Sequence, residues 1–107
     1  MTDQAQDALA VLRPGYLKRL GERHAILTAT VAVMAGREQS ATEKEETHRL
    51  AHSMGSSAAI YGYQALSDAA RAAERLYDHA ASAQADRTTA LTRLVEEARL
   101  VLAKDAP

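Results

Sequence analysis

The sequence predicts an all-α protein, folded as an antiparallel four-helix bundle with a short additional N-terminal helix. Its 107 residues include many alanines but only two prolines and five glycines. Apolar residues recur three or four positions apart along most of the chain, which is the spacing of one face of a helix. Long amphipathic helices joined by short connections pack as an antiparallel bundle. We expect a single domain over residues 1–107.

The first two predicted helices are separated by Pro14 and Gly15. A short helix covers about residues 3–12, and a longer one follows because proline is accepted in the first turn of a helix. Apolar residues from Tyr16 to Met34 keep the helical spacing, and Gly36 ends this second helix.

The third predicted helix begins at Ser40 or Thr42, both of which are N-cap residue types. Thr42 with Glu45 matches a capping box, and the helix runs to Tyr61 and ends at Gly62. A fourth helix begins near residue 64 and fades in the segment "ASAQAD". A fifth covers about residues 86–104, where leucine, valine and alanine again follow the helical spacing.

Composition excludes several classes of function. The absence of cysteine rules out disulfides, thiolate metal sites and cysteine nucleophiles. A net charge of −1, from 13 basic and 14 acidic residues, argues against nucleic acid or an anionic membrane as the main partner. The most apolar stretch, residues 25–35, is much shorter than the roughly 20 residues of a membrane span, and the N-terminus is acidic, unlike a signal peptide. We expect a monomeric, cytoplasmic domain.

One histidine of the third predicted helix stands on its outer face. On a helical wheel His52 lies almost opposite the residues assigned to the core, which are Leu50, Met54, Ser57, Ala58 and Tyr61. The wheel places His48, Gly55, Ser56 and Ala59 beside it. A glycine within a helix costs up to about 1 kcal/mol relative to alanine. The small residues therefore predict a flat face on which another protein can approach the imidazole.

The residues that follow His52 resemble the motif of the histidine-containing phosphotransfer (HPt) domains of bacterial phosphorelays. Met54, Ser57, Gly62 and Leu66 stand at matching positions. Tyr61 and Tyr63, on either side of the glycine, are similar to the chemotaxis-kinase branch of that family. The resemblance covers residues 48–77.

The resemblance implies that His52 is the phosphoacceptor and that Glu74, the matching acidic position, orients its ring. It further implies that His48, Gly55, Ser56 and Ala59 form the face on which receiver domains dock. The partners are then response-regulator receiver domains and a histidine kinase. The chain needs no cofactor, because the divalent metal belongs to the receiver domain, and it is too short to include an ATP-binding catalytic domain, so no autokinase activity is expected.

Two positions depart from the family pattern. Gly55 stands where the family has a lysine that is thought to attract the phosphoryl group, and Ser56 stands where it has a glycine. On the predicted wheel, a lysine at position 55 would lie beside His52 on the outer face. Whether its loss slows or abolishes phosphoryl transfer is left open by the sequence.

Helix geometry also brings Glu74 toward His52. His52 lies ten residues before Gly62 and Glu74 lies twelve after it, so at about 1.5 Å per residue the two side chains are at nearly the same height on neighbouring helices. A carboxylate there can hold the proton on one ring nitrogen and leave the other as the nucleophile. The alternative is an ordinary surface carboxylate that pairs with Arg71 or Arg75.

Other functions compete with phosphotransfer. The domain can be an adaptor that binds a receiver or a kinase without carrying phosphate. It can also be an unrelated bundle that assembles through the apolar faces of its first and last helices. His48 and His52 have a spacing that can bind zinc or nickel, but two imidazoles alone make a weak site, so no metal is expected. His24 and His79 are interpreted as surface residues.

Overall fold

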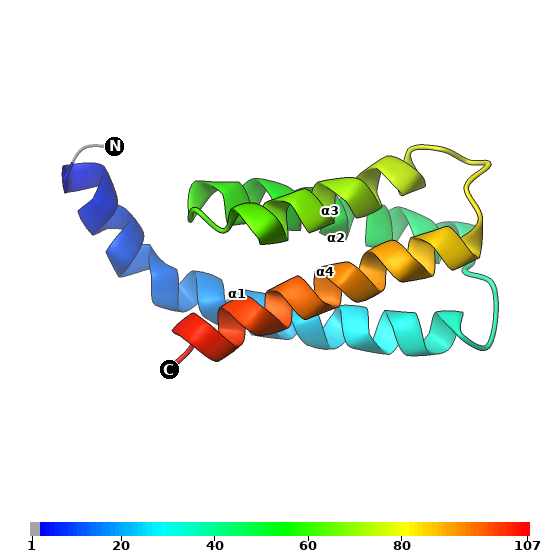
Figure 1. Ribbon diagram of the computed structural model, residues 1–107, viewed down its shortest axis with the longest axis horizontal. Coiled ribbons are helices and arrows are strands. Elements are labelled where there is room, and N and C mark those ends of the chain that lie inside the picture. Colours follow the sequence, from blue (N-terminus) through cyan, green and yellow to red (C-terminus); the bar gives the residue numbers. More distant parts are fainter. Residues whose placement is uncertain (1–2) are drawn as a thin grey trace.

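A computed structural model describes residues 3–107 of the chain. Within this range there are four helices and no strand: α1 (Asp3–Met34), α2 (Ala41–Ile60), α3 (Gln64–Tyr77) and α4 (Gln84–Asp105). Consecutive helices run in opposite directions (Figure 1). α2 packs on α3, α3 on α4, and α4 on α1. The predicted all-α four-helix bundle is confirmed.

The predicted break at Pro14 is wrong, because α1 continues through it. Proline within a helix removes one backbone hydrogen bond and bends the axis without necessarily ending the helix. Pro14 is exposed, so water can reach the carbonyl group that loses its partner. The additional N-terminal helix is therefore the first part of α1, which is inclined to the rest and extends beyond the end of the bundle (Figure 1).

The N-terminus of α2 is closed by a capping box, but one formed by Ser40 and Glu43. The Ser40 hydroxyl accepts a hydrogen bond from the Glu43 N–H at 3.1 Å, and the Glu43 carboxylate accepts one from the Ser40 N–H at 2.8 Å. The prediction of Thr42 with Glu45 is wrong because Thr42 already lies inside the helix, whereas Ser40 has the extended backbone that an N-cap requires. Hydrogen bonds from Arg37 and from the Ser40 backbone lower the pKa of Glu43 to about 2.

The turn between α2 and α3 depends on Gly62, which has a φ of 82°. This left-handed conformation is open to glycine at little cost and ends the helix as predicted. The tyrosines on either side hold the turn against the rest of the bundle. Tyr63 donates to the Asp105 carboxylate of α4 at 2.6 Å and accepts from the Arg13 guanidinium of α1 at 2.7 Å.

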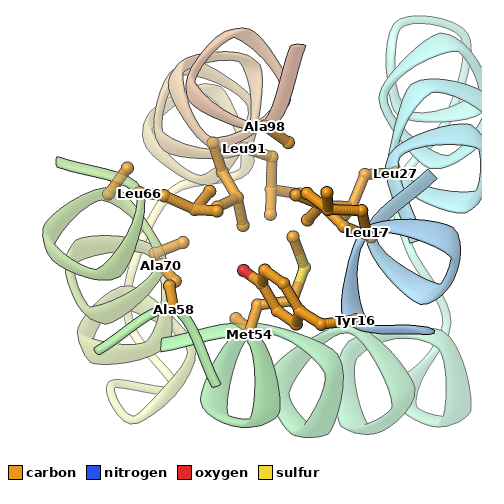
Figure 2. Packing of buried hydrophobic residues seen from close by; sticks show 14 of the residues in the cluster. Tyr16, Leu17, Leu27, Met54, Ala58, Leu66, Ala70, Leu91 and Ala98 are labelled. Atoms are coloured by element: carbon orange, nitrogen blue, oxygen red, sulfur yellow. The ribbon is translucent and has the colours of Figure 1, made fainter. Parts of the chain in front are cut away.

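The core lies between the four helices and is filled by leucines, alanines, methionines and one tyrosine (Figure 2). The Tyr16 ring stacks on Tyr61 at 4.3 Å and on Tyr63 at 5.9 Å between ring centroids. α2 and α3 contribute mainly small side chains. The buried apolar residues are Tyr16, Leu17, Leu20, Leu27, Met34, Ala51, Met54, Ala58, Leu66, Ala69, Ala70, Ala73, Leu91, Leu94 and Ala98.

The hydroxyl of Tyr16 is buried without a hydrogen-bond partner in the described part of the chain, and it points into the bundle in Figure 2. Replacing Tyr16 by phenylalanine keeps the ring stack and removes this desolvated group. We expect Tyr16→Phe to leave the free energy of unfolding at neutral pH unchanged or to raise it by about 1 kcal/mol, as measured by urea titration. A loss of stability instead would show that the hydroxyl is hydrogen-bonded in solution.

The same variant tests how the stability of the protein depends on alkaline pH. Burial raises the pKa of Tyr16 from 10.0 to about 12, with the neighbouring Tyr63 hydroxyl adding to the shift. A raised folded-state pKa means that the stabilisation is complete below pH 10 and is lost as the pH rises toward 12. Urea titrations across this interval should show a smaller loss of stability in Tyr16→Phe than in the native protein. Equal losses of stability in the two proteins would contradict a raised pKa of Tyr16 in the folded state.

Candidate functional site

His52 lies near the middle of α2 and points away from the core. Its side chain is 68% exposed. The buried residues of α2 lie on the side of the helix that faces the core and α3: Thr47, Ala51, Met54, Gly55 and Ala58. An exposed imidazole on a rigid helix is accessible to a second protein while its backbone stays fixed.

A carboxylate from α3 holds the His52 ring. Nδ1 of His52 lies 2.5 Å from Oε2 of Glu74, whose side chain is only 22% exposed. With the proton on Nδ1, the ring donates to the carboxylate and leaves the Nε2 lone pair outside the pair. Among the described residues Glu74 forms no ion pair with Arg71 or Arg75, so the structure brings together the two residues that the helix geometry placed at one height.

Small residues make this contact between helices possible. Ala51, Gly55 and Ala58 of α2 are buried, as are Ser67, Ala70 and Ala73 of α3. The Ser67 hydroxyl donates to the Gly55 carbonyl at 2.9 Å. A side chain at position 55 would begin 3.6 Å from the Ala70 Cβ, which shows how closely the α3 side chains approach the α2 backbone.

The expectation that Gly55 belongs to the outer face is therefore wrong. Gly55 is buried against α3, because the core-facing side of α2 is rotated toward α3 relative to the predicted wheel. A Cβ at this position would lie 3.3 Å from Cγ of Arg71. A lysine at position 55 would thus start against the Arg71 side chain and not in open solvent.

The outer face next to His52 keeps the other predicted small residues and adds one apolar residue. Ser56 and Ala59 are exposed, and Ile60 is 59% exposed at the end of the same helix. We call Ser56, Ala59 and Ile60 the docking face. The wheel did not single out Ile60, although its angular position beside Ser56 was available from the sequence.

His48 is engaged away from this face. Its Nε2 lies 2.8 Å from the Asp78 carboxylate, and its ring stacks on Tyr77 at 6.5 Å between centroids. His48 and His52 are thus each held by a carboxylate of the α3 region, but through opposite ring nitrogens. The structure does not bring His24 or His79 into this site, and within residues 3–107 no group of three or more His, Asp or Glu side chains is arranged to hold a metal ion.

One of three comparisons with known proteins gives a match, and this match covers nearly the whole chain. A family model described as the Hpt domain matches residues 3–103. Searches of curated proteins and of solved structures found no match. Within the described residues, no helix combines the length and apolar character needed to cross a membrane.

The contact between His52 and Glu74 predicts one tautomer of the ring. In the native protein at mildly alkaline pH, the ¹⁵N chemical shifts of His52 should show a protonated Nδ1 and an unprotonated Nε2. Glu74→Ala removes the acceptor, so we expect the two shifts to move together toward the mixture of a free imidazole. The far-UV circular dichroism should not change, because the pair lies at the surface.

His48 is the internal control for this measurement. Its Nε2 is the nitrogen that faces Asp78, so it should show the opposite tautomer and stay unaffected by the Glu74 change. An unchanged His52 pattern in Glu74→Ala would show that the carboxylate does not set the tautomer.

Proposed function

We propose, from the premise that this chain belongs to the Hpt domain family, that His52 carries a phosphoryl group from the receiver domain of a histidine kinase to a response regulator. The family implies histidine phosphotransfer in two-component signalling. The observation that supports His52 as the carrier is its exposed ring with Nδ1 held by Glu74 at 2.5 Å.

The geometry suits the chemistry of a carrier. The Nε2 lone pair of His52 attacks the phosphorus of an aspartyl phosphate, the bond between phosphorus and the aspartate oxygen breaks, and the aspartate leaves as a carboxylate. The ring then has an N–P bond at Nε2 and keeps its proton on Nδ1. Glu74 stabilises the positive charge that the ring acquires, and the reverse step passes the phosphoryl group to the next aspartate.

The partner supplies the rest of the reaction centre. Phosphoryl transfer depends mainly on positioning and on charge stabilisation, and in this proposal the divalent metal belongs to the receiver domain. The domain itself needs no cofactor and does not phosphorylate itself from ATP. We place it with its receiver partners in the cytoplasm and expect it to act as a monomer.

The docking face is the surface on which we propose that receivers bind. Ser56 and Ala59 present little side chain beside His52, so another backbone can approach closely, and Ile60 provides an apolar contact one turn after Ser56. Apolar contacts surrounded by small polar groups are common at the centre of protein interfaces. Gly55 has no part in this surface because it is buried.

Phosphate labelling tests the carrier role. We expect a receiver domain phosphorylated on aspartate to transfer its label to the native chain, giving the acid-labile, base-stable phosphate of a phosphohistidine. His52→Gln should abolish the label, because the nucleophile is lost while the surface position keeps the helix intact. His79→Gln is the matched control, since His79 is also exposed, and should label normally. Label that survives in His52→Gln would place the acceptor elsewhere, and a native chain that binds receivers without label would be an adaptor.

A substitution on the docking face tests where the receiver binds. Ser56→Arg introduces a long charged side chain beside His52. We expect it to weaken receiver binding about tenfold, because the added side chain prevents the close contact of the receiver with the docking face. Titration calorimetry would measure the dissociation constant. Thr92→Arg is the control. Thr92 is exposed on α4 and, like Ser56, donates a hydrogen bond from its hydroxyl to the backbone carbonyl four residues before it. Equal affinities for both variants would place the interface on another surface.

A further inference from the structure

The outward surface of α1 has a heptad repeat that the bundle itself does not use. From Ala8 to Val33, residues on this surface recur alternately four and three positions apart, which is the spacing of the a and d positions of a coiled coil. All eight positions are exposed. We call them the α1 stripe: Ala8, Leu12, Gly15, Arg19, Glu22, Ile26, Ala29 and Val33.

The stripe leaves apolar side chains in water. Leu12 is 57% exposed, Ile26 54% and Val33 44%, and these three are half of the large apolar residues that are exposed within residues 3–107. The core of the same chain lies on another side of α1, where Leu20 and Leu27 are buried. Apolar residues that line up along the exposed side of a long helix indicate a surface that meets a partner.

The order of residues along the stripe is complementary to its own reverse. Two copies of α1 can run antiparallel about a twofold axis midway between positions 19 and 22, so that each a position of one copy faces a d position of the other. Every apolar layer then combines one small side chain with one large side chain, which allows close packing of the two helices. The facing pairs, each formed twice, are Ala8 with Val33, Leu12 with Ala29, Gly15 with Ile26, and Arg19 with Glu22.

The charges in the middle of the stripe select this orientation. Arg19 of each copy faces Glu22 of the other, which gives two ion pairs across the axis. Within the single chain, over residues 3–107, neither side chain forms an ion pair. Parallel pairing would instead place arginine against arginine and glutamate against glutamate, and facing like charges are costly. The charge pattern therefore favours the antiparallel pair.

The protruding end of α1 is covered in the same arrangement. The residues before Pro14 extend beyond the end of the bundle (Figure 1), and their own chain leaves Leu12 exposed. In the antiparallel pair this end lies against Ala29 and Val33 of the other copy. These two residues, with Leu50 of α2, line a cleft of about 350 Å³ between α1 and α2. An exposed leucine and an open apolar cleft are thus brought to the same place.

We propose that two copies of this chain associate through the α1 stripe as an antiparallel, twofold-symmetric pair. Each layer buries one large apolar side chain or one ion pair, so the expected association is reversible and depends on protein concentration. The pairing needs neither a kinase nor a receiver and is therefore independent of the proposed function. Each chain still acts as a monomer in phosphoryl transfer, because its own Glu74 holds His52 on the side of α2 that faces α3.

Sedimentation equilibrium tests the pairing. For the native chain we expect a mass that rises with concentration from the 11.5 kDa of one chain towards twice that value. Arg19→Glu and Glu22→Arg each place like charges at the centre of the pair, so each should raise the dissociation constant at least about tenfold. Arg93→Glu is the control and should associate normally, because Arg93 is exposed on α4 and its replacement changes the net charge as much as Arg19→Glu does.

Mixing the two single variants gives the sharpest result. Each variant repels its own copies, but a mixture of Arg19→Glu with Glu22→Arg restores opposite charges across the axis. The double variant Arg19→Glu/Glu22→Arg does the same within one chain. Both should associate like the native chain. Association that persists in the single variants, or that the mixture does not restore, would place the contact elsewhere, and a native chain that stays monomeric up to millimolar concentration would overturn the proposal.

Disulfide trapping tests the orientation. The chain has no cysteine, so introduced thiols are the only ones present. Leu12→Cys mixed with Ala29→Cys should form a mixed disulfide on mild oxidation, because the two positions face each other. Leu12→Cys alone should not form one, since antiparallel pairing separates the two copies of this position by about 25 Å. A disulfide in Leu12→Cys alone, without the mixed product, would contradict the antiparallel register. Circular dichroism of each variant shows that loss of folding is not the cause.

Discussion

The close approach of α2 and α3 is the constraint on which the site depends. These two helices meet through alanine, glycine and serine, and the Ser67 hydroxyl bonds directly to the Gly55 carbonyl across the seam. Larger side chains would separate the helix axes. Since the carboxylate of Glu74 reaches the His52 ring at 2.5 Å, even a small separation would remove the contact that sets the ring.

The small residues of α2 therefore serve two surfaces. Those that face α3, such as Gly55 and Ala58, allow the neighbouring helix to pack closely. Ser56 and Ala59 have short side chains on the outer surface of α2, which leaves room for another protein beside His52. The helix propensity lost at Gly55 is offset by tighter packing, because buried area and the Ser67 hydrogen bond both depend on the close approach. Adjacent small residues of this run thus serve different purposes: some allow close helix packing, and others leave the outer surface accessible.

The remainder of the bundle holds this seam in place. The stacked rings of Tyr61, Tyr16 and Tyr63 tie the α2–α3 turn to α1, and the bond from Tyr63 to Asp105 ties it to α4. The turn is consequently fixed against both α1 and α4. Fixing the turn fixes the register of α2 against α3, and the register decides which residue of α3 faces His52.

The sequence by itself determined the number of bundle helices, the end of α2 at Gly62 and the height match of His52 with Glu74, because apolar spacing and helix rise are local properties. It did not determine that α1 passes through Pro14, since a proline can bend a helix without ending it. Only the tertiary structure decided that Gly55 is buried and not exposed. A helical wheel gives angles within one helix, but the side that is buried depends on where the neighbouring helix lies, and α3 covers Gly55 with Arg71.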